Sequence, residues 1–278
     1  MPFGLRPDGD LAYGVPATRR IMPFIMSSRT ESAVYFEQQV DCQAIWSFVE
    51  QHRARTGQHT TFLHLLIWAF ARTVRRHPRL NRFTAGRRLY QRRGVWVSFS
   101  AKKEKSDDSP VSVVKRQIDP DWTLAQLVEE VTKAKDTELS DAPSSTDREL
   151  GLLLALPTFM TSCFVALARR LDAFGMLPAA MIRSDPLFAS VFIANLGSIG
   201  MDAGFHHLYE WGNIPIFITV GQRATRLVPG ADGRAEQREM LTLRYTFDER
   251  VEDGLYCLKA LASLKDLLEN PAGTNAAP

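Results

Sequence analysis

Apolar residues recur along this chain at the spacings of both helices and strands, which predicts a domain that mixes the two. Residues 33–40 (AVYFEQQV) are rich in Val, Tyr and Phe and predict a strand. The next segment has apolar residues at i, i+3, i+4 and i+7, and Asp41 is placed to cap this helix. A second helix with one apolar stripe follows Thr60 or Thr61 and is predicted to end before Pro78, because proline cannot continue a helix.

Both patterns continue through the rest of the chain. Short strands are predicted between residues 81 and 114, and Thr123 with Gln126 predicts a capping box for a helix over residues 124–139. The run SDAPSSTD at residues 140–147 predicts a loop. In the last hundred residues the pattern predicts strands at 190–195, 214–220 and 240–247, with a hairpin near residue 230. A closing helix with a leucine stripe is predicted at 254–268.

The glycine-containing turns exclude two classes of nucleotide-binding protein. The strand predicted at 190–195 is followed by NLGSIG and not by a GxGxxG turn that opens a helix, so a dinucleotide site is not indicated. The chain holds no GxxxxGK[ST] sequence, which excludes a P-loop.

Length and composition are those of an ordinary globular protein. The 278 residues include 45% hydrophobic and 23% charged residues, which excludes collagen-like, low-complexity and wholly disordered chains. This length corresponds to one or two domains. We expect an N-terminal arm over residues 1–28, a single domain over 29–271 and a disordered tail over 272–278.

Charge and cysteine content narrow the compartment and the partners. A net charge of +3 is too small to indicate nucleic acid as a partner. The three cysteines form no CxxC pair, which argues against a disulfide framework and a structural zinc site, so we expect no metal. The N-terminus has no apolar secretory signal, and the expected compartment is the cytoplasm.

One segment is unusually apolar. Residues 151–168 run for 18 positions without a charge, which is the lower limit for a membrane-spanning helix. Pro157 interrupts this segment, and threonine and serine residues add polarity, so we expect no membrane span. We predict instead a helical hairpin, broken near Pro157, that covers an apolar channel.

The densest charged cluster is the run DERVEDG at residues 248–254, between a predicted strand and a predicted helix. Crowded carboxylates raise one another's pKa, and a helix N-terminus attracts a negative charge. The cluster has a structural interpretation, in which Asp253 caps the helix and Arg250 pairs with the solvated Glu249 and Glu252. It also has a catalytic one, and the residues alone leave both open.

Three segments carry a resemblance to a known family: FIANLGSIG at 192–200, the strand at 214–220, and the motif D-x-R-x-x-D-G at 248–254 before a helix. They resemble the catalytic domain of the dihydrolipoamide acyltransferases, which are core components of 2-oxo-acid dehydrogenase complexes. The resemblance extends from about Arg29 to Pro271. The pair of motifs DERxxDG and HHLY also resembles a branch of bacterial acyltransferase-like sequences.

The resemblance implies a fold and a set of partners. The fold would be an α/β two-layer sandwich like that of chloramphenicol acetyltransferase, with a mixed sheet packed with helices. The assembly would be a homotrimer or a higher multiple of trimers, with the active site between subunits and channels for coenzyme A and the acyl carrier. No lipoyl domain is recognised in the chain, so any such domain is expected to act in trans.

This chain departs from the family at both catalytic positions. The family motif DHRxxDG has its general-base histidine where this chain has Glu249, and the family's oxyanion-binding serine or threonine corresponds to Ala194. A free glutamic acid is a poorer base than a free histidine by about two pKa units. Removing one oxyanion donor typically lowers the rate by a factor of about 100 to 1,000. Backbone N–H groups of the turn Gly197–Gly200 are candidates to replace that donor.

The resemblance assigns the remaining candidate residues. Arg250 and Asp253 would hold the geometry of the catalytic motif, with Arg29 as the ion-pair partner of Asp253, and Asn195 and Gly197 would shape the oxyanion turn. His206 and His207 are candidates to face the channel, and packing at the surface or in the core is the alternative that the residues favour. Nine arginines between residues 72 and 93 form either a solvated or interface surface or a set of phosphate contacts to coenzyme A.

Three hypotheses follow from these residues. The first is a stand-alone acyl-CoA-dependent acyltransferase with Glu249 in the position of the usual base. The second is a catalytically silent member of the fold that binds a ligand or builds an oligomeric scaffold. The third is a membrane-peripheral protein that uses residues 151–168.

Overall fold

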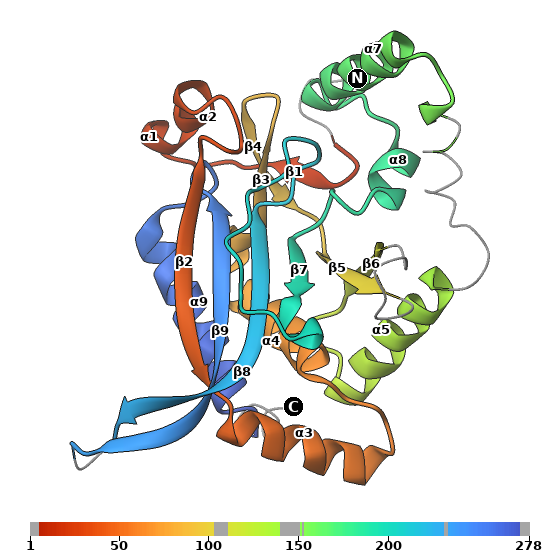
Figure 1. The fold of residues 1–278 in the computed structure, drawn as a ribbon. Helices are drawn as coiled ribbons and strands as arrows, with labels where there is room; N and C mark the ends of the chain where they lie inside the picture. The colour runs from red at the N-terminus through yellow and green to blue at the C-terminus, as the bar shows by residue number, and fades with distance from the viewer. Residues whose placement is uncertain (1–5, 103–110, 140–150, 152, 231–232, 273–278) are drawn as a thin grey trace.

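A six-stranded mixed sheet with the strand order β2-β9-β8-β7-β5-β6 forms the centre of the molecule (Figure 1). The computed structural model describes residues 6–102, 111–139, 151, 153–230 and 233–272. β7 runs parallel to β5 and β8, and the other neighbours are antiparallel. The strands are β2 (Ala33–Asp41), β5 (Val95–Lys102), β6 (Val111–Ile118), β7 (Val191–Asn195), β8 (Ile216–Pro229) and β9 (Ala235–Asp248).

Four helices pack on one face of this sheet and enclose the main core. They are α3 (Gln43–Thr56), α4 (Phe62–Arg76), α5 (Leu124–Glu138) and α9 (Gly254–Glu269). Along β8, Ile216, Ile218 and Val220 point into this core, whereas Phe217 belongs to a smaller cluster on the opposite face. The predicted two-layer α/β sandwich with a mixed sheet is therefore confirmed, and the second face of the sheet carries the candidate site.

A second sheet joins the N-terminal segment to the body of the molecule. It has three strands in the order β1-β4-β3, which are β1 (Gly9–Leu11), β4 (Arg88–Arg92) and β3 (Arg82–Ala85). The short helices α1 (Ala17–Arg20) and α2 (Met22–Ile25) follow β1 and lie above the main sheet in Figure 1. Residues 6–28, expected as an arm, thus form the paired strand β1 and the short helices α1 and α2.

Most of the predicted elements are confirmed, and the differences have physical causes. The Thr123 and Gln126 capping box opens α5, and a similar box between Thr61 and His64 opens α4. The cap predicted at Asp41 is wrong, because Asp41 completes β2 and Cys42 is the N-cap of α3; the Asp41 carboxylate still accepts the Gln43 N–H at 2.9 Å. The predicted loop at 140–147 and residues 273–278 of the tail lie outside the described residues.

The apolar segment breaks near Pro157 as predicted, but its apolar side chains are largely exposed in the single chain. α7 (Thr158–Ala173) begins directly after Pro157, and only Ala168 on it is buried. Phe159, Phe164 and Leu167 are each about half exposed or more. A short helix α8 (Ala179–Ser184) follows. Within the part of the chain that the structure describes, no helix combines the length and apolar character needed to cross a membrane.

Candidate active site

The acidic motif begins with a buried ion pair at the end of β9. Arg250 donates two hydrogen bonds to Asp248, from Nε to Oδ1 and from Nη2 to Oδ2, each 2.8 Å long. Thr84 of β3 also donates to Asp248, at 3.3 Å. Burial alone would raise the pKa of Asp248, but the Arg250 hydrogen bonds and the charges of Arg29 and Arg250 outweigh it and lower that pKa. The pair therefore stays ionised and fixes the backbone on both sides of Glu249.

Glu249 is exposed, although both of its neighbours in the chain are buried. Its backbone N–H donates to the Ser32 carbonyl at 2.9 Å, and its carbonyl accepts a hydrogen bond from Arg19 Nη1 of α1. Its carboxylate has no ion-pair or hydrogen-bond partner among the described residues. The structure thus holds the Glu249 backbone rigidly and directs an unpaired carboxylate to the surface.

The other two acids of the motif differ from the sequence-based expectations. Glu252 is 5% exposed and pairs with Arg82 at 3.2 Å and Arg79 at 3.3 Å, so it is not a solvated partner of Arg250. Asp253 is the N-cap of α9 and accepts the Tyr256 N–H at 3.0 Å, as the structural interpretation expected. That hydrogen bond, with the charge of Arg19 adding to it, lowers the pKa of Asp253.

Arg29 does not serve the partner role expected for it. The predicted Arg29–Asp253 pair is wrong, because the Arg29 guanidinium lies 4.0 Å from Asp248 and donates to the Ile214 carbonyl. Arg29 is buried near the end of β9, and its charge helps to lower the pKa of Asp248, the first acid of the motif. The arginine whose charge reaches Asp253 is Arg19, which the sequence pattern did not single out.

The NLG segment forms a tight turn at the end of β7. Ala194 and Asn195 are the last residues of β7, and a 3-10 helix, η2 (Leu196–Ile199), follows. A side chain at Gly197 would place its Cβ 2.3 Å from the Gly221 carbonyl oxygen of β8, so only glycine fits. The Gly200 N–H donates to the Gly197 carbonyl at 3.2 Å and is therefore not free to bind an oxyanion.

The two histidines lie on the same face of the sheet as Ala194. His206 stacks on Phe217 with 3.8 Å between ring centroids and 5° between planes, and His207 stacks on His206 at 4.9 Å. Phe217 in turn stacks on Phe192, and Ala194 packs against the same cluster. His206, His207 and Ala194 therefore lie in one cluster on this face of the sheet.

Hydrogen bonds show which ring nitrogen of each histidine, Nδ1, carries a proton. His206 Nδ1 lies 2.6 Å from the His207 carbonyl oxygen, and His207 Nδ1 lies 3.0 Å from the Leu208 carbonyl oxygen. A carbonyl only accepts, so each Nδ1 carries a proton. Burial lowers the pKa of His206, which favours the neutral ring. His206 therefore presents an Nε2 atom that can accept a proton.

Within one chain, Ala194 and Glu249 are far apart. Ala194 pairs with Thr219 of β8, and Thr219 pairs with Arg244 of β9. Glu249 follows Arg244 by five residues, which corresponds to roughly 16 Å along an extended strand. The two side chains cannot contact each other directly. The His206 carbonyl accepts a hydrogen bond from Thr246, which lies between Arg244 and Glu249 in the chain, so His206 lies between Ala194 and Glu249.

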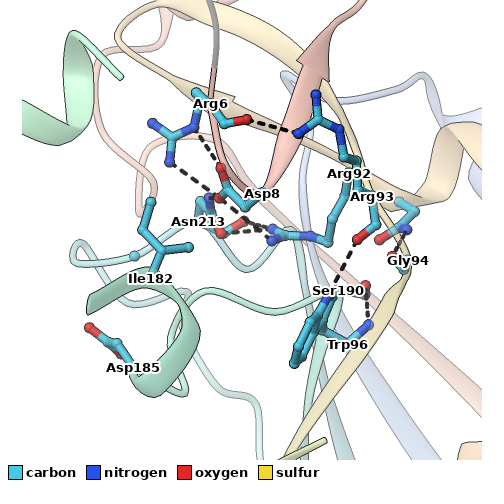
Figure 2. A network of polar contacts seen from close by, with 12 residues as sticks. Arg6, Asp8, Arg92, Arg93, Gly94, Trp96, Ile182, Asp185, Ser190 and Asn213 are labelled. Carbon is cyan, nitrogen blue, oxygen red and sulfur yellow. Dashed lines mark hydrogen bonds and ion pairs between the residues drawn. The ribbon is translucent and has the colours of Figure 1, made fainter. Parts of the chain in front are cut away.

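A buried network beside the site was not recognised in the sequence. Figure 2 shows Asp8 between Arg6 and Asn213, with Arg92 on the other side of Asn213. Arg92 is 4% exposed, and burial lowers its pKa to about 9 against the opposing charge of Asp8. Arg6 also binds Asp172 of α7 at 2.7 Å. The network ties the N-terminal segment, the small sheet and α7 together.

The described residues offer no cluster of three or more histidine, cysteine, aspartate or glutamate side chains that could bind a metal ion.

Similar folds occur among solved structures. A probable dihydrolipoamide acetyltransferase from Listeria monocytogenes aligns with a TM-score of 0.61 at 16% identity, over 97% of this chain and 98% of that one. The cubic core of a pyruvate dehydrogenase multienzyme complex aligns at 0.61 and 20% identity, over 94% and 93%. A chloramphenicol acetyltransferase aligns at 0.55 and 11% identity, over 91% and 96%. These likenesses define an acyltransferase-type fold.

The family follows from the sequence match. Residues 16–136 and 185–275 match the model of the 2-oxoacid dehydrogenases acyltransferase (catalytic domain) family, which is well over half of the chain. The protein belongs to this family. No curated protein matched the chain.

Proposed function

We propose that the protein transfers an acyl group between coenzyme A and an acceptor, at a site shared between the subunits of a homotrimer or of a higher multiple of trimers. Family membership supports the acyltransferase class. The observation that carries the proposal is the placement of Glu249: it stands at the motif position of the family's base, on a backbone held by Ser32 and Arg19, and its carboxylate pairs with no described residue. A merely solvated acid needs no such support.

The separation of the two halves of the site favours a second subunit. Glu249 and the NLG turn lie roughly 16 Å apart along the strands of one chain, beyond direct contact. A neighbouring copy can bring its Ala194 turn and His206 to Glu249 and cover the exposed carboxylate. The cubic core that aligns with this chain is a multi-subunit assembly, which supports the same arrangement.

The proposed reaction needs one proton acceptor and one oxyanion site. A base takes the proton from the acceptor's nucleophilic atom, which attacks the thioester carbonyl and forms a tetrahedral oxyanion. The intermediate collapses, the acceptor keeps the acyl group, and the coenzyme A thiolate recovers the proton from the base. Glu249 is our first candidate for this base, and backbone N–H groups of the Gly197–Gly200 turn, other than that of Gly200, are candidates for the oxyanion site.

A catalytically silent binder or scaffold is the second candidate function. The loss of the oxyanion hydroxyl at Ala194 favours it, as does the exposure of Glu249 in a single chain. On this alternative the subunits still assemble, but they transfer no acyl group.

Two substitutions test the proposal. Glu249→Gln should abolish acyl transfer from acyl-CoA while leaving coenzyme A binding and the melting temperature unchanged, and Glu249→His should retain or raise activity. Glu50→Gln on the exposed face of α3 is the matched control and should behave like the wild type. Binding is measured by calorimetry, and transfer by release of free thiol. A wild-type protein that binds but transfers nothing would support the silent alternative.

The same assay separates the two possible bases. If the His206 imidazole accepts the proton, His206→Gln should lower kcat/KM by about 100-fold or more, and Glu249→Gln should act mainly on KM. If Glu249 is the base, Glu249→Gln abolishes transfer and His206→Gln retains most of it.

A further inference from the structure

A cavity of about 300 Å³ is lined by Arg250, whose buried guanidinium pairs with Asp248. Its wall is formed by the turn between β3 and β4, the end of α7, the α2 segment and the chain around Trp211. Four arginines line it: Arg29, Arg87, Arg169 and Arg250. We infer that this cavity is a binding site for a small oxyanion, either a phosphate or a carboxylate group. The inference does not depend on acyl transfer or on Glu249.

Charge around the cavity is unbalanced in favour of an anion. Two buried guanidinium groups, Arg29 and Arg250, share the single carboxylate of Asp248. The Nε of Arg29 is buried and has no hydrogen-bond partner among the described residues. Burial lowers the pKa of Arg29, while the charge of Asp248 opposes that effect. This wall therefore carries one excess positive charge in a poorly solvated place, which is costly unless an anion comes close.

The acids that line the cavity do not cancel this excess. Asp172 already pairs with Arg6 at 2.7 Å. Glu210 accepts hydrogen bonds from the N–H and the hydroxyl of Thr30, at 2.9 and 2.8 Å, and is a single exposed carboxylate. Arg87 and Arg169 at the rim have no ion-pair partner among the described residues. The sum is about two positive charges, which matches a phosphate or a dicarboxylate.

The rim arginines are held where a ligand can reach them. Arg87 has a backbone φ of 61°, the only positive value among the described residues other than glycine. The same turn is fixed by Gly86, where an added Cβ would lie 1.9 Å from the Ala173 carbonyl oxygen of α7. Arg87 also lies over the Phe24 ring, 5.6 Å from its centroid. A guanidinium offers two parallel N–H donors, the geometry that phosphate and carboxylate groups accept.

Calorimetry with inorganic phosphate and with malonate tests the site on the full chain. We expect saturable binding of at least one of the two anions at one site per subunit. Arg87→Gln and Arg169→Gln should each weaken it by roughly ten-fold, as loss of one charge-assisted hydrogen bond does. Both side chains are exposed, so neither change should alter the melting temperature without ligand. Arg170→Gln, one position along α7 and outside the cavity, is the matched control and should bind like the wild type.

The two anions also identify the ligand chemistry. Tighter binding of phosphate assigns a phosphate group, and tighter binding of malonate assigns a carboxylate. Thermal shifts should rise with the same anion, because a ligand that binds the folded state stabilises it. No saturable binding of either anion at millimolar concentration would overturn the inference, and so would equal weakening by Arg170→Gln. Acyl transfer plays no part in either readout, so the outcome is separate from that of the proposed function.

Discussion

The arginines between residues 72 and 93 illustrate what a sequence says about single residues. Their spacing suggested one basic surface, yet Arg79 and Arg82 bind the buried Glu252, and Arg92 is buried beside Asn213. Arg87 is the member of this group that lines the cavity for which we propose anion binding. The residue type identifies the positive charges, but long-range contacts decide which arginines are already paired or buried and which can contact a ligand.

The same limit applies to the candidate site. The sequence located Glu249, Ala194 and the histidines, because motif order along the chain marks them. It placed Arg29 opposite the wrong acid, since the choice among Asp248, Glu252 and Asp253 depends on where residues 6–30 pack against the sheet. The sequence motif does not record that packing.

Lys115 of β6 provides a test of burial at the scale of one residue. Its Nζ donates to the carbonyls of Ile182 and Asp185, at 2.7 and 2.8 Å, and lies over the Trp96 ring. Burial lowers the pKa of Lys115 to about 8, with the charge of Arg92 adding to this effect and the charges of Asp185 and Asp8 opposing it. The folded state therefore releases this proton at a lower pH than the unfolded chain.

The sign of the effect follows from linkage. Between pH 8 and 10.5 the unfolded chain binds more protons at this site, so the free energy of unfolding gains a term that rises with pH. This term is at most about 3 kcal/mol, at 1.36 kcal/mol per pKa unit. Relative to Lys115→Met, the wild type should gain stability across this range, as measured by urea unfolding. If the two curves ran parallel, separated only by a constant offset from the lost hydrogen bonds, the buried charge of Lys115 would be contradicted.

At the scale of elements, prediction succeeded where one local pattern determines the structure. The α4 and α5 boundaries and the closing helix follow from caps, proline and apolar periodicity. β1 was missed because three residues with no apolar alternation become a strand only by pairing with β4. β8 runs beyond its predicted end and β9 begins before its predicted start. Residues 221–229 and 235–239 lack the apolar alternation of a buried strand, and they pair with each other in a projecting hairpin (Figure 1).

The turn between β3 and β4 is the element on which the cavity wall depends most. Gly86 has a φ of 54° and packs against α7, so Gly86→Ala adds both backbone strain and a clash with the Ala173 carbonyl. We expect a loss of about 2 kcal/mol or more and a melting temperature several degrees lower. Gly57→Ala, with a φ of 70° but open space around it, isolates the strain and should cost only about 1 kcal/mol. Equal losses for both variants in differential scanning calorimetry would mean that the contact with α7 contributes nothing.

At the scale of the whole molecule, two features of the single chain indicate that it assembles with further copies of itself. The outer face of α7 leaves Phe159, Phe164 and Leu167 exposed, and the two halves of the proposed site lie at different rows of the sheet. Family resemblance predicted the assembly, whereas no pattern in the sequence says which surfaces meet. Light scattering should give about 94 kDa, three times the 31.3 kDa chain, or a multiple of that mass.

Mixing two inactive variants tests whether the site is shared between subunits. Glu249→Gln removes the proposed base, and Ala194→Phe fills the space beside the NLG turn, so each protein alone should transfer no acyl group. In a mixed trimer, an interface that joins an intact Glu249 of one subunit to an intact Ala194 turn of the next regains both halves. Random mixing by co-expression should therefore restore about a quarter of the wild-type activity per site. Circular dichroism and scattering check that each variant still folds and assembles. If the site lay within one chain, every chain in the mixture would carry one defect, and no activity would return.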